Sequence, residues 1–123
     1  MTMKFFLPYP LSANKYWRNV NGRMVVSAEA KEYKNTVGWL AKGAGIRPHV
    51  GDVFLKILLH PKTKKDGEAS NVRVDLDNVL KVMCDALNGI AFADDKQITK
   101  INLEISHPIQ NGGLSVTIWG VDD

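Results

Sequence analysis

Hydrophobic and polar positions repeat along this chain with two different periods, and these periods predict both strands and helices. Residues 53–59 form a nearly continuous apolar run of strand length, which is typical of a central strand covered on both faces. Residues 4–7 predict a shorter strand, which Pro8 stops. Residues 101–105 and 114–118 each alternate between apolar and polar side chains, so we expect two strands that pair as an antiparallel hairpin.

Two other segments repeat their apolar residues at helical spacing. The first follows Ser27, a residue type that caps helices, and should run to about Gly43 or Gly45. The second covers about residues 75–88 and ends at an asparagine followed by a glycine. Between the first strand and the first helix, the dipeptide Asn21-Gly22 predicts a small hairpin with a tight turn.

Composition indicates one folded domain. The 123 residues are 45% hydrophobic and 24% charged, which is enough to bury a core without disulfides. We therefore expect a single α+β domain over residues 1–123, in which a mixed or antiparallel β-sheet packs with two main α-helices. Cys84 is the only cysteine, which excludes an internal disulfide and any multi-thiolate zinc site. The apolar runs are too short for a membrane span or a signal peptide, so we expect a cytoplasmic protein without membrane contact.

Charge is distributed unevenly along the chain. Residues 1–73 contain 13 Lys and Arg against 5 Asp and Glu, a net +8, whereas residues 74–123 contain 3 against 8, a net −5. This asymmetry favours a basic surface for an anionic partner beside an acidic site for a cation. The alternative is that folding mixes the charges over the surface. Residues 62–73 are polar and mostly basic, and we expect an exposed, flexible loop there.

Aspartates are concentrated between residues 75 and 95, where no glutamate lies among them. They are Asp75, Asp77, Asp85, Asp94 and Asp95. Mg²⁺ takes oxygen ligands and keeps several waters, so short carboxylates that face a phosphate suit it. Helix and turn capping would explain the same residues, with Asp85 paired to Lys81, and the two uses are compatible. Lys81 is then either a surface ion-pair partner or a cation that holds a phosphate.

A second group of interest lies in residues 14–18, which combine basic and aromatic side chains. Lysine and arginine can contact phosphates there, and a ring can stack on an unpaired base at a branch point. Packing against the hairpin is the alternative role for Trp17. We interpret Trp39 and Trp119 as core or interface residues. The three histidines are too widely spaced for a zinc site, and no phosphate-binding glycine motif is present.

The aspartate-rich segment resembles a known family. The residues Asp75-Leu76-Asp77-Asn78-Val79-Leu80-Lys81, followed by Asp85-Ala86-Leu87 and Phe92-Ala93-Asp94-Asp95-Lys96-Gln97, look like those of the RusA-like Holliday junction resolvases. Residues 7–18 and 26–33 also resemble that family, so the similarity spans nearly the whole chain in order.

The resemblance implies a structure-selective endodeoxyribonuclease that resolves four-way DNA junctions during recombination and repair. Cleavage would be paired, Mg²⁺-dependent phosphodiester hydrolysis, with Mn²⁺ as a plausible substitute and no small-molecule cofactor. By that similarity Asp75, Asp77 and Asp95 would coordinate the metal, and Lys81 would be the catalytic lysine. The resemblance also implies a homodimer with two active sites, and it suggests a phage or prophage setting.

The sequence departs from the family pattern just before the aspartate motif. The pattern places several arginines there, whereas here only Arg73 is close and three lysines lie on a longer loop. The DNA contacts that we expect are Asn14, Lys15, Tyr16, Arg18, Lys62, Lys64, Lys65 and Arg73. Two alternatives remain open at this stage: a non-catalytic module that binds branched DNA, and a metal-dependent nuclease that acts on flaps or RNA.

Overall fold

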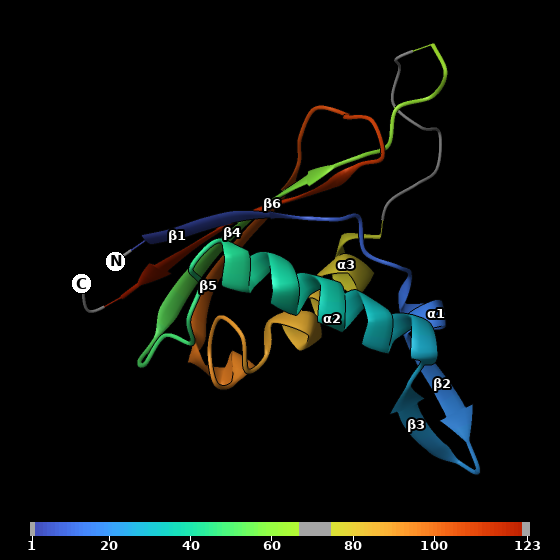
Figure 1. The fold of residues 1–123 in the computed structure, drawn as a ribbon, viewed down its shortest axis with the longest axis horizontal. Coiled ribbons are helices and arrows are strands. Elements are labelled where there is room, and N and C mark those ends of the chain that lie inside the picture. The colour runs from blue at the N-terminus through green and yellow to red at the C-terminus, as the bar shows by residue number, and fades with distance from the viewer. Residues whose placement is uncertain (1, 67–74, 122–123) are drawn as a thin grey trace.

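The computed structural model describes residues 2–66 and 75–121, which form a four-stranded mixed sheet with its two main helices on one side (Figure 1). This arrangement confirms the predicted α+β class. The strands of the sheet lie in the order β1 (Thr2–Leu7), β6 (Gly113–Gly120), β4 (Val53–His60) and β5 (Ile98–Ile105). The main helices are α2 (Ala28–Gly43) and α3 (Leu76–Leu87).

Strand β4 lies inside the sheet, as its apolar sequence predicts, but only one of its faces is covered. Val53, Leu55 and Ile57 are buried on the helix side, whereas Phe54 and Lys56 are exposed on the other side. The expectation of a strand covered on both faces was therefore wrong. Phe54 therefore places an aromatic side chain on the uncovered face of the sheet.

Strands β5 and β6 do not form the expected hairpin, because β4 lies between them. Strand β4 pairs in parallel with β5 and antiparallel with β6. The connecting residues 106–112 cross the end of β4 instead of turning back. The N–H of Ser106 donates to the carbonyl of Leu59 at 2.8 Å, and the N–H of Ile109 donates to that of Pro61 at 3.0 Å. The more hydrophobic strand thus takes the interior position, which alternation in β5 and β6 alone could not reveal.

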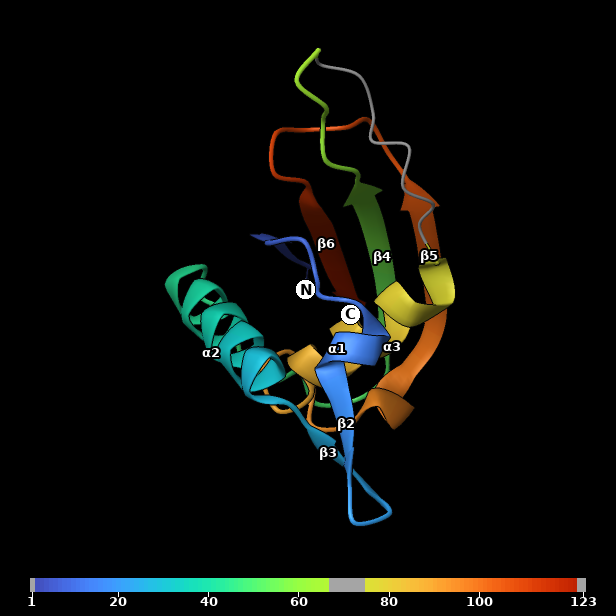
Figure 2. The same cartoon turned by 90° about the vertical axis from the view of Figure 1, so that its right-hand side faces the viewer.

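The predicted small hairpin is confirmed, and it projects from the body of the protein (Figures 1 and 2). It consists of β2 (Trp17–Val20) and β3 (Arg23–Val26), and it follows the four-residue helix α1 (Ala13–Tyr16). Asn21 and Gly22 have φ values of 52° and 80°, the positive values that a two-residue hairpin turn requires.

Helix α2 begins where the sequence predicts. The Ser27 hydroxyl accepts the N–H of Ala30 at 3.1 Å and donates to the carbonyl of Lys15 at 2.6 Å, so it caps α2 and fixes the end of α1. Trp39, expected in the core or an interface, is 73% exposed on this helix and is therefore not a core residue. No helix within residues 2–66 and 75–121 is long and apolar enough to cross a membrane.

Candidate active site

Asp75 caps helix α3, as the capping interpretation predicts. Its Oδ1 accepts the backbone N–H of Asp77 at 3.1 Å and that of Asn78 at 3.4 Å, and its Oδ2 accepts the side-chain amide of Asn78 at 2.9 Å. The carboxylate is exposed, and a carboxylate has about four acceptor positions, so these bonds leave capacity for another partner. Capping therefore positions the Asp75 carboxylate and leaves an acceptor position open to another partner.

Asp77 and Lys81 lie one turn apart on the exposed side of α3. The Nζ of Lys81 is 3.9 Å from Oδ2 of Asp77, and the two side chains are 61% and 77% exposed. An exposed pair of this kind contributes only about 0.3–0.5 kcal/mol to stability. Both charges are therefore available to a substrate or an ion.

Asp85 has a different environment from the one that its spacing suggests. A pair with Lys81 was one alternative for it, but its Oδ2 accepts the Tyr16 hydroxyl and lies 3.3 Å from Nζ of Lys34. Burial, followed by the hydrogen bond to Asp85, raises the pKa of Tyr16 well above its ordinary value. Asp85 thus connects α3 to α1 and α2, and it holds the base of the hairpin against α3.

The turn at residues 93–97 presents Asp95 through a network centred on Gln97. The Gln97 side chain accepts the N–H groups of Ala93 at 2.8 Å and Asp94 at 3.0 Å, and it donates to the carbonyls of His49 at 2.8 Å and Gly51 at 2.7 Å. In the sequence, Gln97 stands out only as part of the family pattern. It follows Asp94 by three residues, which is a capping-box spacing, and that spacing is the local signal from which its positioning role could have been predicted.

Asp94 and Asp95 have pKa values shifted in opposite directions. The backbone N–H of Lys96 donates to Asp94 at 2.9 Å, and this bond lowers the pKa of Asp94. A hydrogen bond to Asp94, followed by burial and the charge of Asp94, raises the pKa of Asp95. The opposite shifts show that the two carboxylates interact, and a bound cation would favour the charged form of both.

Asp95 faces a cleft of about 370 Å³ between the outer side of α3 and the base of the hairpin. The lining residues are Trp17, Leu80, Lys81, Cys84, Asp85, Asn88 and Asp95. Burial and the charge of Asp95 raise the pKa of Cys84 to about 11, which keeps its thiol protonated at neutral pH. The Oδ1 atom of Asn88 is buried and has no hydrogen-bond partner among the described residues. The cleft therefore combines a cation, Lys81, with two carboxylates, Asp85 and Asp95.

The three expected metal ligands do not meet within one chain. Asp75 and Asp77 lie at the start of α3, whereas the cleft of Asp95 lies against its later turns. The ten residues from Asp75 to Asp85 span about 15 Å of helix. Within the ranges 2–66 and 75–121, no three acidic, histidine or cysteine side chains come close enough to hold a metal ion. These residues do not fit a complete three-carboxylate site as they stand.

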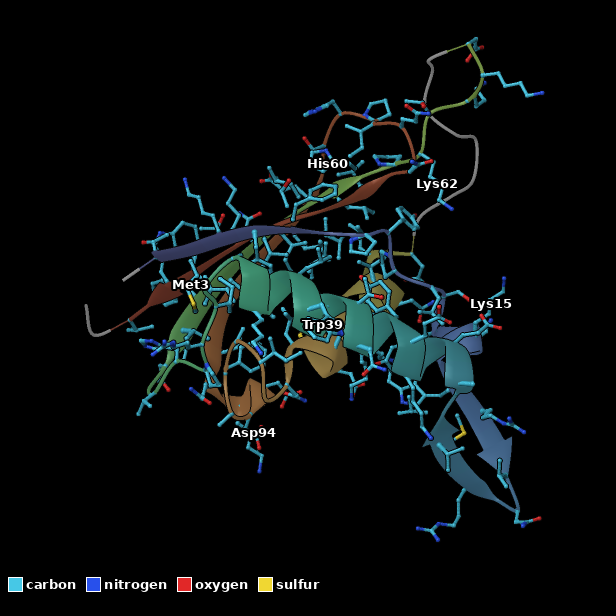
Figure 3. All side chains as sticks on the ribbon, viewed as in Figure 1. Met3, Lys15, Trp39, His60, Lys62 and Asp94 are labelled. Atoms are coloured by element: carbon cyan, nitrogen blue, oxygen red, sulfur yellow. The ribbon has the colours of Figure 1, made fainter. Side chains whose placement is uncertain are left out.

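The expected DNA contacts are mostly exposed. Lys15 and Lys62, both labelled in Figure 3, line one groove of about 640 Å³ together with Tyr9, Tyr33, Glu29 and Glu32. The Nζ of Lys62 lies 5.3 Å from the centre of the Tyr9 ring. The exposed members of the set are Asn14, Lys15, Arg18, Lys62, Lys64 and Lys65, whereas Arg73 lies outside the described residues.

Tyr16 is the exception among these residues. It is fully buried, so its ring is not available to DNA, and the expectation of a DNA contact was wrong. Its ring packs against Trp17 with the ring centres 4.5 Å apart. Tyr16 is a core residue, because its ring packs among apolar side chains beside α3. Its hydroxyl donates a hydrogen bond to Asp85.

Comparison with known proteins gives one consistent result. Residues 8–119 match the family model described as Endodeoxyribonuclease RusA. The chain is 34% identical over 116 residues to the crossover junction endodeoxyribonuclease rusA of Enterobacteria phage HK97, covering 94% of this chain and 92% of the relative. It is 32% identical over 120 residues to the protein of the same name from Enterobacteria phage 82, and 33% identical over 120 residues to that of Escherichia coli K12. These two matches each cover 95% of this chain and 93% of the relative.

Proposed function

This chain belongs to the RusA family of endodeoxyribonucleases, and from that membership we propose that it resolves four-way DNA junctions by paired strand cuts. The observation that carries the proposal is the acidic outer side of α3, where Asp77, Lys81 and the cleft of Asp95 follow one another along the helix. Carboxylates beside an exposed lysine suit phosphodiester hydrolysis, because the lysine can hold a phosphate while the carboxylates serve a cation or a water.

Exposed basic residues in other parts of the chain support DNA as the substrate. Lys15 and Lys62 share the groove beside α2, and Arg18 is exposed on the hairpin whose base borders the cleft. We propose that these residues, with Asn14, Lys64, Lys65 and Arg73, contact the phosphates of the junction arms. Such contacts position the DNA without reading its sequence.

The family relation also supports a divalent cation, which we propose to be Mg²⁺, with Mn²⁺ able to replace it. Mg²⁺ needs only one or two carboxylates when substrate phosphates and waters complete its shell. Asp75, Asp77 and Asp95 are the ligands that we propose. Because no three acidic, histidine or cysteine side chains of the described residues come close enough to hold a metal ion, we assign no reaction step to the cation.

We further propose that the protein works as a homodimer in the cytoplasm, during recombination and repair. A four-way junction contains two strands to be cut symmetrically, and a two-fold dimer supplies two equivalent sites. Light scattering at several protein concentrations tests the dimer. A mass of one chain across the range in which the protein cuts junctions would contradict it.

The central experiment compares labelled four-way junctions, flaps, duplex DNA and RNA hairpins, each with Mg²⁺ or with EDTA. Paired nicks confined to the four-way junction and dependent on Mg²⁺ are the expected result. Cleavage confined to flaps or RNA would replace the substrate that we propose. Junction binding without any cleavage would show a non-catalytic module.

Asp77→Asn and Asp95→Asn test the proposed ligands separately. Each variant should bind the junction in EDTA at least as tightly as the parent, because a negative charge near phosphate is removed, yet cut at least 100-fold more slowly. Glu104→Gln is the matched control, since Glu104 is exposed on β5 and points away from α3. Normal cutting by either aspartate variant would remove that residue from the site.

A further inference from the structure

The side of the sheet opposite α2 and α3 forms a second surface, which we call the open sheet face. Strand pairing places its side chains in three rows that cross all four strands. The rows are Thr2, Trp119, Phe54 and Lys100; then Lys4, Thr117, Lys56 and Asn102; then Phe6, Ser115, Leu58 and Glu104. No described residue outside the sheet covers these rows at their centre, since both main helices lie on the other side (Figures 1 and 2). The active-site proposal makes no use of this face.

Three aromatic residues lie on this face, and two of them, Phe54 and Trp119, border hollows. Phe6 is 48% exposed and Phe54 is 36% exposed. Both lie within strands, and a helix or second sheet on this face would bury them. Phe54 and Trp119 line a hollow of about 470 Å³, and Trp119 also lines a second hollow of about 280 Å³. Flat rings beside open hollows offer stacking surfaces for planar groups.

The charges on the open sheet face are mostly positive. Lys4, Lys56 and Lys100 face a single acidic residue, Glu104, among the described side chains of the three rows. Lys4 and Lys56 flank Thr117 on the strand between them, so their backbones lie about 10 Å apart. The Nζ of Lys100 lies 5.7 Å from the centre of the Phe54 ring, which places a cation directly beside an aromatic surface.

One end of the face is closed by a fixed histidine. His60 is only 5% exposed; its Nδ1 is 3.0 Å from the carbonyl of His107, and its Nε2 is 2.8 Å from the Ser115 hydroxyl (Figure 3). Its ring also lies 6.2 Å from that of Phe6. Because both ring nitrogens are already bonded, this end is rigid, and an occupant would lie across the rows near Trp119, Phe54 and Lys56.

We propose that the open sheet face binds single-stranded DNA, with bases stacked on Phe54 and Trp119 and phosphates held by Lys4, Lys56 and Lys100. This goes beyond junction cleavage, because it assigns a second nucleic-acid site on the side away from α3. Aromatic rings stack on bases only where the bases are unpaired, which selects a single strand over duplex DNA. A second copy of the chain is disfavoured as the occupant, since two such faces would bring six lysines together with two glutamates.

Binding of a labelled oligothymidylate, measured by anisotropy in EDTA, tests the proposal without any cleavage. Phe54→Ala and Lys56→Glu should each bind about tenfold more weakly than the parent. Phe54→Tyr keeps the ring and should bind like the parent. Lys31→Glu is the matched charge control, because Lys31 is exposed on α2, and it should bind like the parent too. The changed side chains are exposed, and a melting curve for each variant confirms that it is folded.

Tryptophan fluorescence supplies a second measurement. The chain has three tryptophans, and stacking on Trp119 should quench part of the emission when oligothymidylate binds. Trp119→Phe should lose that part of the quenching and retain binding. Unchanged oligothymidylate binding in both Phe54→Ala and Lys56→Glu would overturn the proposal. A Phe54→Ala variant that binds normally but has a smaller mass in light scattering would also overturn it, because the face would then join two copies of the chain. Junction cleavage in Mg²⁺ is assayed separately, so either proposal can fail while the other holds.

Discussion

At the scale of single residues, Tyr16 shows how a side chain near the site acts through the fold. The sequence places it in a basic, aromatic segment, which favours a role on DNA. In the structure its ring is buried and its hydroxyl donates to Asp85, a residue 69 positions away. Local sequence holds no information on that partner, so the burial of Tyr16 could not be predicted, whereas the cap at Asp75 could, because capping is a local interaction.

Tyr16→Phe tests the contribution of that hydroxyl. The variant keeps the buried ring and loses a hydrogen bond to a charged group, so the free energy of unfolding should fall by about 1.5–3 kcal/mol. Urea denaturation measures the change. In an Asp85→Asn background the same substitution should cost clearly less, because its partner is already altered. Equal losses in the two backgrounds would show that Tyr16 and Asp85 are not energetically coupled.

The same tyrosine makes stability depend on alkaline pH. Burial raises the pKa of both Tyr16 and Tyr33 above the ordinary value of 10.0, so the folded protein favours their neutral forms. Their contribution to stability is therefore fully present below about pH 10 and is lost as the pH rises above it. The urea midpoint should fall as the pH rises above about 10, in addition to any fall from about pH 9 that the raised pKa of Cys84 causes, and the fall above pH 10 should be smaller in Tyr16→Phe. A midpoint that is unchanged between pH 9 and pH 11 would contradict this.

At the scale of elements, the sequence predicted those features that depend on neighbours along the chain. Helices α2 and α3 and the β2–β3 hairpin lie close to their predicted bounds, because caps, turn residues and periodicity are local properties. The prediction that β5 pairs with β6 was wrong, because strand order depends on which strand buries the most apolar surface inside the sheet. Strand β4 takes that place and separates the two strands.

Gln97 is the element-scale residue whose role is easiest to test. Its side chain makes four hydrogen bonds that join the turn of Asp95 to residues 49–51. Gln97→Ala should lower the free energy of unfolding by about 2 kcal/mol, since each bond contributes about 0.5–1.5 kcal/mol and some are replaced by water. It should also slow junction cleavage by moving Asp95, with little change in junction binding in EDTA. Gln110→Ala is the control, because Gln110 is exposed on the loop after β5. Full activity in Gln97→Ala would show that the turn does not position Asp95.

At the scale of the whole molecule, the fold answers the question raised by the uneven charge of the two halves of the chain. The alternatives were separate basic and acidic surfaces or complete mixing. The acidic strip of α3 stays distinct, as the aspartate spacing suggested, but lysines from both halves share the open sheet face, where Lys56 lies on the strand next to that of Lys100 and Lys4 lies on the far edge strand. Sequence could predict the aspartates as a group. It could not predict that the helix keeps Asp95 away from Asp75, because that depends on where the turn after α3 packs.

The groove of Lys15 and the open sheet face are two separate basic regions, and DNA binding at each should depend on salt concentration. Each phosphate contact releases counterions, so the logarithm of the junction affinity should fall linearly with the logarithm of salt concentration, with a slope of about −0.9 per contact on duplex DNA. Lys62 lines the groove of Lys15, and Lys64 is exposed two residues further along the chain. Replacing both with glutamine should make the slope shallower by about 1.8 and leave oligothymidylate binding unchanged. Lys56→Glu should have the opposite pattern, weakening oligothymidylate binding more than junction binding. If both variants weakened the binding of junction and of oligothymidylate equally, the two basic regions would act as one continuous DNA-binding surface. That result would contradict the proposal of two separate binding sites.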